Sequence, residues 1–492
     1  DEELFASSEV HFQGQPIALI IAESDLIGFE ARNLISIQIT EKEIVVDPRD
    51  AHQKNQLIFP PRTFKLGNSK EAWSKCTYVF EGRADTNGQE HLYIETQGAY
   101  AQPQENGNIK VSSSTQGPTA VQRAIAKVLD VGMNKIEVDV VRLGGGFGGK
   151  EDQATPWAVM ACLGTFVLKK PVKVVLHRLD DMQMTGKRHP YSSDYKIGFS
   201  DDLKILAYEA NFYQNAGGAA DLSPAVMERT LFHATNSYFV PNVEVTAYSC
   251  KTNLPPNTAF RGFGGPQGMF VIEAAISHAA TEIGVPTYEL QKKNLLRNGD
   301  EFPYGQILDQ VGLSQIWSDM ETKFDITSSK KRIEDFNKSN GNLKKGMSLM
   351  PISFGISFTK TPMNQARALV HVYSDGSIGV STGAVEMGQG VNTKMLQIAA
   401  QIFSIDPKKV KLESTNTTRV ANTSPTAASA TADLNGKALQ IACNRLLERL
   451  KSSAANYFNT TEENIELKNE KIYVKGIEKE MSWAQLVDMA FL

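Results

Sequence analysis

Four segments rich in glycine or small residues are the part of the sequence best suited to chemistry. They are Gly144–Gly149, Arg261–Gln267, Glu386–Gly390 and Thr423–Ser429. Glycine lets the backbone adopt positive φ values and approach a ligand closely. Such loops present N–H groups, and the start of a helix adds positive potential, so together they can bind a polar, anionic ligand. Four loops of this kind predict one large cofactor at a domain interface.

The motif Gly-Phe-Gly-Gly occurs in two of these segments, at 146–149 and at 262–265. The two copies lie too far apart along the chain to be the period of a solenoid repeat. We therefore predict that the two loops perform a similar task with their backbones.

The first loop, Gly144–Gly149, also matches the G-x-G-x-x-G pattern of dinucleotide-binding folds. In those folds the helix opens at the glycines, and an acidic residue follows about 20 residues later. Here Thr155–Pro156 places the helix start further along, and Asp180 comes about 30 residues after the loop, against the spacing of that fingerprint. A nicotinamide-dependent dehydrogenase that uses Gly144–Gly149 is kept as an alternative.

Composition sets the class of protein. The 492 residues suggest about three domains. Lys and Arg number 51 against 55 Asp and Glu, and a net charge of −4 argues against a nucleic-acid partner. The most apolar stretch, Trp157–Leu168, is too short to span a bilayer, so no membrane partner is expected.

The 4 cysteines form no CxxC pair, which excludes a sequence-local zinc or iron–sulfur site and favours a reducing, cytoplasmic compartment.

Hydrophobic patterning and turn residues predict a mixed α+β chain. Strands are predicted at Val10–Phe12, Pro16–Ala22, Leu34–Thr40, Cys76–Arg83, Lys110–Ser113, Lys135–Leu143, Val172–His177, Ile205–Gln214, Ser348–Phe358 and Ala368–Tyr373. Helices are predicted at Leu26–Arg32, after N-caps at Thr155 and Ser223, from Pro266 to about Gly284, and at Ser328–Asn340, Val391–Phe403, Ala432–Leu450 and from Ser482 onward. Residues 46–70, interrupted by Pro60 and Pro61, are predicted to form a linker. Since the chain begins at Asp1 without an initiator methionine and stops inside a predicted helix, we expect a piece of a longer protein.

At the four loops the sequence resembles the molybdenum-cofactor part of the xanthine dehydrogenase/aldehyde oxidase family of molybdenum hydroxylases. The matching stretches are 144–151, 259–267, 386–390 and 424–429, with further likeness at 1–6 and 89–96. The resemblance implies an α+β (mixed α/β) fold: the end of an a/b hammerhead domain followed by two molybdopterin-binding domains with mixed sheets and helices. The implied boundaries are 1–66 for the partial hammerhead domain and linker, 67–325 for the first molybdopterin-binding domain, and 326–492 for the second, C-terminally truncated one.

The same resemblance implies the cofactors and partners. The family holds molybdenum through the dithiolene sulfurs of a pterin, so no side chain is expected to bind the metal directly. Its reaction is the hydroxylation of an electron-poor carbon, with electrons leaving to [2Fe–2S] clusters and FAD. We expect those groups on other domains or subunits, a purine substrate, and a homo-oligomer of the full complex.

Cofactor-binding residues are carried over from the resemblance one motif at a time. Gln116 resembles the glutamine that hydrogen-bonds an oxygen ligand of molybdenum. The other expected cofactor contacts are Gly146, Phe147, Gly148, Arg261, Gly388, Gln389, Ala428, Ser429 and Thr431.

Substrate-binding residues follow in the same way. Phe263 and Phe358 resemble the two phenylalanines that enclose a flat substrate ring, an arrangement that gains from aromatic stacking. Glu151 and Arg229 match the acid and the arginine that bind purine in xanthine dehydrogenases, and Thr359 is expected to add a hydrogen bond. An arginine so placed stabilises negative charge that develops on the ring. We expect Glu151, Arg229 and Gln116 to be catalytic, and the reaction to convert hypoxanthine to xanthine and urate.

Simpler interpretations stay open for the two charged residues. Glu151 can instead only stabilise the start of a helix, and Arg229 can instead only form a surface ion pair. Lys360 and Thr361 stand where the family commonly has apolar residues, and Arg367 stands where it has a small one. Oxidation of aldehydes or other N-heterocycles therefore remains an alternative within the family.

One expected catalytic group is missing from the sequence. The family's catalytic base is a glutamate in a Gly-x-Gly-Glu loop, and no segment of this sequence matches it. We therefore expect the chain by itself to be inactive and assign no residue to that role. A non-catalytic pterin-binding or assembly module is a further alternative.

Overall fold

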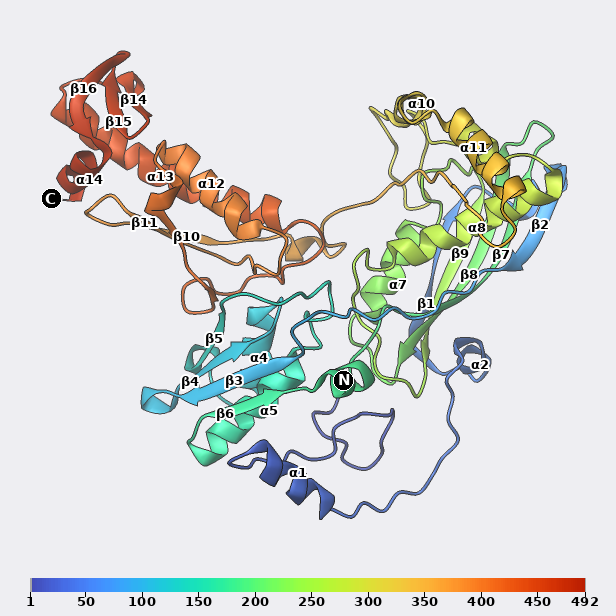
Figure 1. The fold of residues 1–492 in the computed structure, drawn as a ribbon, viewed down its shortest axis with the longest axis horizontal. Helices are drawn as coiled ribbons and strands as arrows, with labels where there is room; N and C mark the ends of the chain where they lie inside the picture. The colour runs from blue at the N-terminus through green and yellow to red at the C-terminus, as the bar shows by residue number, and fades with distance from the viewer. Residues whose placement is uncertain (1, 492) are drawn as a thin grey trace.

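The computed structural model describes residues 2–491 and contains four β-sheets with helices on their faces. Two of the sheets have five strands and two have three. Figure 1 shows three regions, with the two larger sheets in separate lobes and the C-terminal helices above the smaller lobe. The predicted mixed α+β fold class is confirmed.

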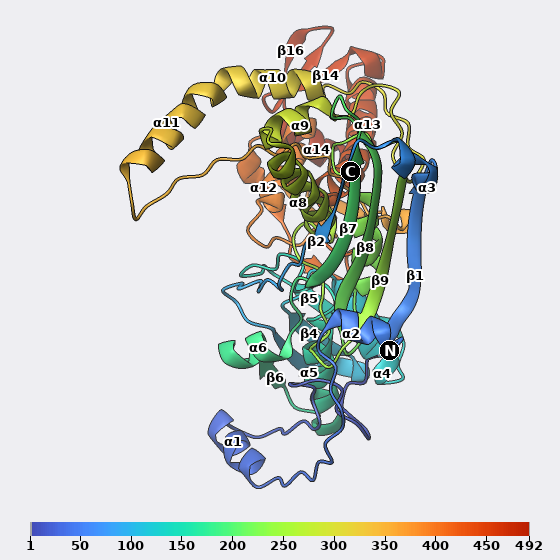
Figure 2. The same ribbon diagram turned by 90° about the vertical axis from the view of Figure 1, so that its right-hand side faces the viewer.

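The longest strands form a sheet with the order β1-β9-β8-β7-β2. Its members are β1 (Leu57–Leu66), β2 (Tyr78–Arg83), β7 (Tyr191–Phe199), β8 (Ile205–Gly217) and β9 (Val243–Lys251). Only β8 and β9 run parallel to each other among these described strands. The strands lie side by side in Figure 2, in which α10 (Leu313–Lys323) and α11 (Ile326–Ser339) project from the rest of the molecule.

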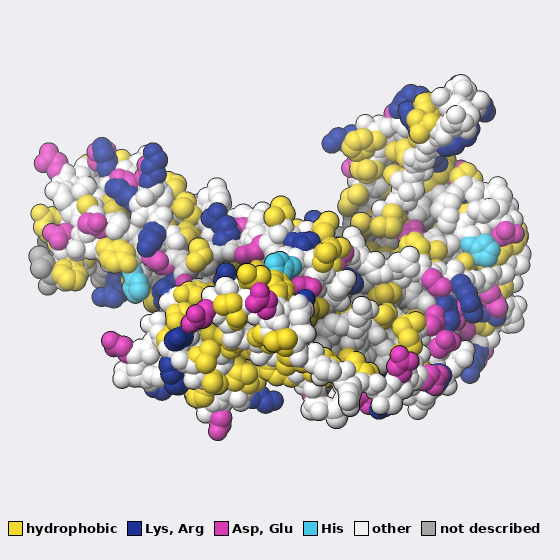
Figure 3. Space-filling view, turned by 60° about the horizontal axis from the view of Figure 1, so that its bottom comes forward, with side chains coloured by type: hydrophobic (Ala, Val, Ile, Leu, Met, Phe, Trp, Pro, Cys, Tyr) yellow, Lys and Arg dark blue, Asp and Glu magenta, His cyan; other side chains and the backbone are white. Residues whose placement is uncertain are grey.

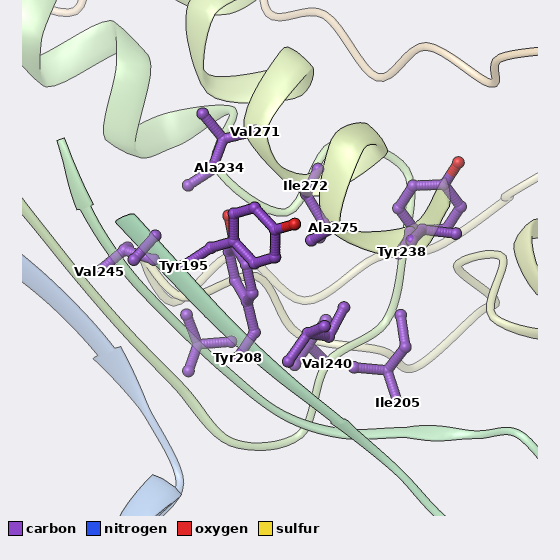
Figure 4. Close-up of a cluster of buried hydrophobic side chains, with 14 of the residues drawn as sticks. Tyr195, Ile205, Tyr208, Ala234, Tyr238, Val240, Val245, Val271, Ile272 and Ala275 are labelled. Atoms are coloured by element: carbon purple, nitrogen blue, oxygen red, sulfur yellow. The ribbon is translucent and has the colours of Figure 1, made fainter. Parts of the chain in front are cut away.

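Helix α8 (Gly265–Ile283) covers one face of this sheet and forms its core. Figure 4 shows Tyr195 and Tyr208 on the strands near Ile272 and Ala275 of the helix. Complete burial of a side chain such as Ile272 contributes about 1.5–3 kcal/mol. The helix ends at Ile283, and Gly284 follows it with a φ of 82°, which suits the left-handed residue that terminates many helices.

A second five-stranded sheet has the order β13-β5-β4-β3-β6. Its members are β3 (Gly98–Pro103), β4 (Ile109–Ser113), β5 (Ile136–Val140), β6 (Val172–Val175) and β13 (Thr415–Asn416). Helices α4 (Pro118–Val128) and α5 (Thr155–Leu168) pack against it. Because β13 pairs with β5, this sheet contains both the first and the last third of the chain.

This sheet rules out the dinucleotide-binding alternative. Of its described pairs only β4 with β5 is parallel, whereas a dinucleotide-binding fold is built on a mostly parallel sheet. The helix after Gly144–Gly149 begins at Thr155, so it does not open at the glycines. The nicotinamide interpretation of this loop is therefore wrong.

The C-terminal region has its own core. One sheet is β10 (Ala368–Val372), β11 (Ile378–Thr382) and β12 (Val410–Leu412), and the other is β14 (Ile465–Lys468), β15 (Lys471–Val474) and β16 (Ile477–Ser482). Helices α12 (Val391–Phe403), α13 (Thr431–Tyr457) and α14 (Trp483–Phe491) share their buried side chains with these sheets. The predicted bounds of α12 agree with the structure.

The remaining helices are short. They are α1 (Asp25–Asn33), α2 (Pro48–Gln53), α3 (Ser69–Ala72), α6 (Arg178–Met184), α7 (Ser223–Phe232) and α9 (Thr287–Lys293). Single 3₁₀ turns lie at η1 (Trp73–Lys75), η2 (Glu105–Gly107), η3 (Met133–Lys135), η4 (Thr361–Met363), η5 (Pro407–Lys409) and η6 (Glu462–Asn464). On the face drawn in Figure 3, hydrophobic side chains gather in patches among charges of both signs.

Four predicted strands are absent from the described residues, namely Val10–Phe12, Pro16–Ala22, Leu34–Thr40 and Ser348–Phe358. Each has strand-like residues, but in this structure none has a partner strand, and an unpaired strand leaves its backbone groups unsatisfied. The predicted linker at 46–70 is also wrong, since it contains α2 and β1. Pro60 and Pro61 are tolerated because β1 is an edge strand with a register shift between Phe59 and Arg62.

Two predicted N-caps are displaced by one residue. Thr155 and Ser223 are the first helical residues of α5 and α7, and the N-cap positions belong to Ala154 and Leu222. Neither cap position makes a side-chain hydrogen bond. Proline therefore marked these helix starts more accurately than the hydroxyl residues did, because proline suits the first turn.

Candidate functional site

One large cavity, with a volume of about 1510 Å³, brings the predicted loops together. It is lined by residues from both five-stranded-sheet regions and from the C-terminal region. Every expected site residue except Gly146 lines it: Gln116, Phe147, Gly148, Glu151, Arg229, Arg261, Phe263, Phe358, Thr359, Gly388, Gln389, Ala428, Ser429 and Thr431. The predicted convergence of the four loops is confirmed.

Several helices begin at the wall of this cavity. The starts of α4, α7, α12 and α13 contribute Gly117, Pro224, Val391 and Thr431 to its lining. Each helix N-terminus carries about half a positive charge from the helix dipole, although at α12 the carboxylate of Glu386 already accepts from the first N–H groups. The cavity therefore favours an anionic ligand.

Gln116 connects two of the loops through its side chain. Its Nε2 donates to the carbonyl of Thr426 at 2.9 Å, and its Oε1 accepts from the N–H of Gly148 at 2.9 Å. A Cβ atom at Gly146 would lie 2.7 Å from that Oε1, so any larger residue there would displace the Gln116 carboxamide. In this structure the Gln116 carboxamide holds the loops in place, and Gly146 lies directly behind it.

The two Gly-Phe-Gly-Gly loops lie against each other. The N–H of Arg261 donates to the carbonyl of Phe147 at 2.8 Å. Phe147 and Phe263 have φ values of 59° and 51°, and Gly148 and Gly264 follow them at 103° and 97°. The two loops share this left-handed Phe-Gly pair, as the repeated motif predicted. Both phenylalanines are presented to the same cavity.

The loop at 386–390 was expected to present free N–H groups, but in the structure these groups already have an acceptor. The carboxylate of Glu386 accepts from Gly388 at 2.8 Å, Gly390 at 3.0 Å and Asn392 at 2.9 Å. Partial burial opposes ionisation, but these three N–H groups hold the pKa of Glu386 below its ordinary value. Glu386 was not predicted, although an acidic residue just before a helix is a recognised stabilising signal. The N–H groups of Gly388 and Gly390 are already satisfied, so the expectation is wrong for these two residues.

Glu151 is buried in the cavity wall beside two further acids. Burial, and then the charges of Asp152 and Asp221, raise the pKa of Glu151 well above its ordinary value. Burial, and then Asp152, likewise raise the pKa of Asp221 to about 8. Asp221 accepts hydrogen bonds from Thr258 Oγ1 at 2.5 Å and from Gln153 Nε2 at 2.8 Å. A protonated Glu151 can donate a hydrogen bond to a ligand. Neither Asp152 nor Asp221 was identified from the sequence.

Arg229 is buried on α7, with 7% of its surface exposed. Its Nη1 donates to the carbonyl of Gly355 at 2.6 Å, and its Nη2 donates to that of Ser357. Its buried Nε has no hydrogen-bond partner among the described residues, and burial lowers the pKa of the guanidinium. The interpretation of Arg229 as a surface ion pair is therefore wrong.

The segment that carries Phe358 is fixed by both halves of the chain. Asn364 Oδ1 accepts from the N–H of Phe358 and its Nδ2 donates to the Phe358 carbonyl, both at 2.9 Å. The N–H of Ser357 donates to the carbonyl of Ala428 at 2.8 Å. Thr359 Oγ1 donates to Glu228 at 3.1 Å. Phe358 is thus held at the cavity on a rigid backbone, whereas the Thr359 hydroxyl is directed to Glu228.

Besides the buried Arg229, four exposed basic side chains at the cavity have no ion-pair partner among residues 2–491. They are Arg123, Arg261, Lys360 and Lys394, and all four are exposed. A fifth basic residue, Arg62, pairs with Glu228 at 2.5 Å. The unpaired cations and the helix starts both make the electrostatic potential in the cavity more positive.

Family models match both halves of the chain. A molybdopterin cofactor-binding domain model matches residues 50–295, and a second model with the same description matches residues 319–492. The chain belongs to the molybdopterin cofactor-binding domain family. The resemblance predicted from the loops is confirmed.

The similarity to complete proteins is partial. The chain is 40% identical over 451 residues to a xanthine dehydrogenase of Dictyostelium discoideum, covering 92% of this chain and 33% of that protein. It is 41% identical to a xanthine dehydrogenase/oxidase of Gallus gallus, with coverages of 92% and 33%. The chain therefore spans about a third of the length of these curated relatives.

Solved structures support the same fold. The structure of quinoline 2-oxidoreductase from Pseudomonas putida 86 superposes with a TM-score of 0.88 at 21% identity, covering 99% of this chain and 65% of that one. A Cu,Mo-CO dehydrogenase superposes with a TM-score of 0.84 at 20% identity, with coverages of 98% and 66%. At this level of identity the likeness concerns the fold alone.

The cavity fits the molybdopterin cofactor of this family. Positions 388 and 390 have positive φ, and a Cβ atom at either would meet nothing within 4 Å, so the backbone there faces open space. Arg261 and Lys394 provide unpaired positive charge for an anionic group. No group of three or more His, Cys, Asp or Glu side chains in the described residues is arranged to hold a metal ion. Within residues 2–491 there is also no helix of the length and hydropathy needed to cross a bilayer.

Proposed function

We propose that this chain is the molybdenum-cofactor-binding part of a longer oxidoreductase that hydroxylates purines, converting hypoxanthine to xanthine and xanthine to urate. Electrons pass to [2Fe–2S] and FAD groups on other domains or subunits of a cytoplasmic homo-oligomer. The observation that carries the proposal is a single cavity lined by Glu151 and Arg229 from one half of the chain and by Phe358 from the other. We propose a domain boundary at 325; the boundary expected at 66 is not kept, because β1 pairs with β9 in the first five-stranded sheet.

The loops would hold the cofactor by its polar groups. The cavity is lined here by Gly388 and Gln389, by the left-handed turn at Ala428 and Ser429, and by Thr431, the first residue of α13. Arg261 and Lys394 would neutralise a phosphate. Phe147, Gly148 and Gln116 would form the wall beside the metal. When bound, the cofactor supplies the two-electron oxidation of the substrate carbon.

The substrate ring would lie between Phe263 and Phe358. Stacked aromatic rings gain about 0.5–1.5 kcal/mol beyond the burial of their area. Glu151, with its raised pKa, would donate a hydrogen bond to a ring nitrogen or oxygen. Arg229, whose side chain lines the cavity, would stabilise the negative charge that develops on the ring. The general base is assigned to no residue of this chain.

The test uses the full-length, molybdenum-loaded enzyme that contains this chain. We expect molybdenum to co-purify in a stoichiometric amount and hypoxanthine and xanthine to be oxidised to urate with an artificial electron acceptor. Oxidation of aldehydes without oxidation of purines would replace the purine assignment by the alternative within the family. Molybdenum binding without turnover of either class would point to a non-catalytic module. Absence of molybdenum would refute the proposal altogether.

A further inference from the structure

We propose that Lys360 is a specificity-determining residue that makes the cavity prefer ring substrates carrying an anionic group over their neutral counterparts. This inference rests on the proposed function, because it concerns the substrate of the same site. It names a chemical class, an N-heteroaromatic ring with a carboxylate or similar negative substituent.

The first step is the position of Lys360. It follows Phe358 and Thr359 directly, and all three residues line the cavity. Its carbonyl accepts from the N–H of Met363 at 2.9 Å, and Asn364 holds the backbone of Phe358 on both sides. The backbone under Lys360 is therefore fixed, while its side chain is exposed at the cavity. An ammonium group is thus attached next to the ring that would stack on the substrate.

The second step is that no nearby acid neutralises this charge. Lys360 has no ion-pair partner among residues 2–491. Its neighbour Thr359 contacts Glu228, which accepts from Thr359 Oγ1 at 3.1 Å and pairs with Arg62 at 2.5 Å. Because Glu228 already interacts with Thr359 and Arg62, the positive charge of Lys360 remains available to a ligand. An unpaired lysine beside a partly enclosed site attracts anions more strongly than one on an open surface.

The third step separates this lysine from the cations of the cofactor. Arg261 belongs to the glycine loop 261–267, and Lys394 lies in the first turn of α12, which follows the loop 386–390. Arg123 lies on α4. Lys360 alone among these four exposed cations follows the Phe358–Thr359 pair in the chain; it precedes the 3₁₀ turn η4 and belongs to none of the glycine loops. Of these four cations, Lys360 is therefore the one attached nearest in the chain to the ring proposed to stack on the substrate.

The test measures binding, so it does not depend on turnover. The full-length, molybdenum-loaded protein is titrated calorimetrically with pyridine-3-carboxylate and with pyridine-3-carboxamide, which share one ring and differ by one negative charge. We expect the carboxylate to bind more tightly, and Lys360→Met to weaken it about tenfold, the size of a single charge-assisted hydrogen bond, while the carboxamide changes less than twofold. Lys360→Arg should keep the preference, and 0.5 M salt should reduce it.

The control is Lys338→Met, the same substitution at an exposed position of α11 that does not line the cavity. It should leave both dissociation constants unchanged. Equal weakening of the two ligands by Lys360→Met, no weakening of either, or failure of both ligands to bind the wild-type protein would each overturn the inference. Failure of the proposed function shows separately, as absence of hypoxanthine oxidation by the wild-type enzyme.

Discussion

Arg229 and Gly355 are joined by a hydrogen bond of 2.6 Å from the guanidinium Nη1 to the backbone carbonyl oxygen. This contact links α7 to the segment that carries Phe358. His233 supports it, since its Nδ1 lies 2.8 Å from the Arg229 carbonyl and its Nε2 accepts from the N–H of Gly355 at 3.2 Å. The residue proposed to stabilise charge on the substrate therefore also positions the aromatic ring proposed to stack on it.

The first prediction concerns this double role of Arg229. In the full-length enzyme, Arg229→Met should lower kcat/KM for xanthine about 10²–10³-fold, the usual cost of removing one donor to a charged transition state. Turnover of an aromatic aldehyde should fall much less, because only the positioning of Phe358 is affected. Steady-state kinetics with both substrates measure the difference. Arg229→Lys should not restore xanthine turnover, since an ammonium cannot span both carbonyls as a planar guanidinium does. Equal losses on both substrates would contradict the assigned role.

The second prediction concerns the contact between the two glycine loops. At Gly148 a Cβ atom would lie 2.8 Å from the carbonyl oxygen of Ala259. Gly148→Ala should therefore destabilise the protein by about 1–3 kcal/mol through this clash, in addition to the cost of placing alanine at a positive φ. The molybdenum content should also fall. The matched control is Gly284→Ala, which has a similar positive φ but meets nothing within 4 Å. Thermal denaturation and metal analysis compare the two variants. Equal destabilisation of both would show that the loops do not need this close approach.

How much of this molecule could be predicted from its sequence differs from one element to another. The bounds of α12 were predicted correctly because a glycine before it and regular hydrophobic spacing mark it locally. The strand β1 was missed because Pro60 and Pro61 are acceptable only on an edge, and edge position is a property of the whole sheet. The segment at 348–358 has the residues of a strand but is held by Arg229, Asn236 and Ala428 from other parts of the chain.

The residues of the candidate site also divide into those that could be predicted from the sequence and those that could not. The glycine loops could be found because φ values such as 103° at Gly148 restrict the residue type. The partners of those loops could not, because Glu386, Asn364 and Asp221 are ordinary polar residues whose hydrogen bonds form only in the folded chain. Long-range pairing such as that of β13 with β5 likewise leaves no local signal.

The third prediction concerns the capping carboxylate of Glu386. The pKa of this group is lowered from 4.5 in the folded protein, so it stabilises the fold above that value, and the contribution is lost as the pH falls through the folded pKa. Glu386→Ala should cost about 1–3 kcal/mol at pH 7 because three N–H groups lose an ionised acceptor. The difference in unfolding midpoint from wild type should shrink below pH 4.5. A difference that is the same at pH 7 and pH 3.5 would argue against an ionised cap.

The last prediction concerns the acids behind Glu151. Burial, and then the charge of Asp152, raise the pKa of Asp221 from 3.8 to about 8. A folded pKa above the unfolded value means that stability is complete below pH 3.8 and is lost as the pH rises toward 8. Asp152→Asn removes the neighbouring charge, so the pKa values of Asp221 and Glu151 should both fall. Between pH 5 and pH 8.5, the midpoint temperature of thermal unfolding should therefore fall less in this variant than in wild type.

The matched control is Asp201→Asn, an exposed aspartate between β7 and β8, which should leave the pH dependence unchanged. Identical pH profiles for wild type and Asp152→Asn would show that the acids do not interact, and would remove the charge-based reason for a protonated Glu151.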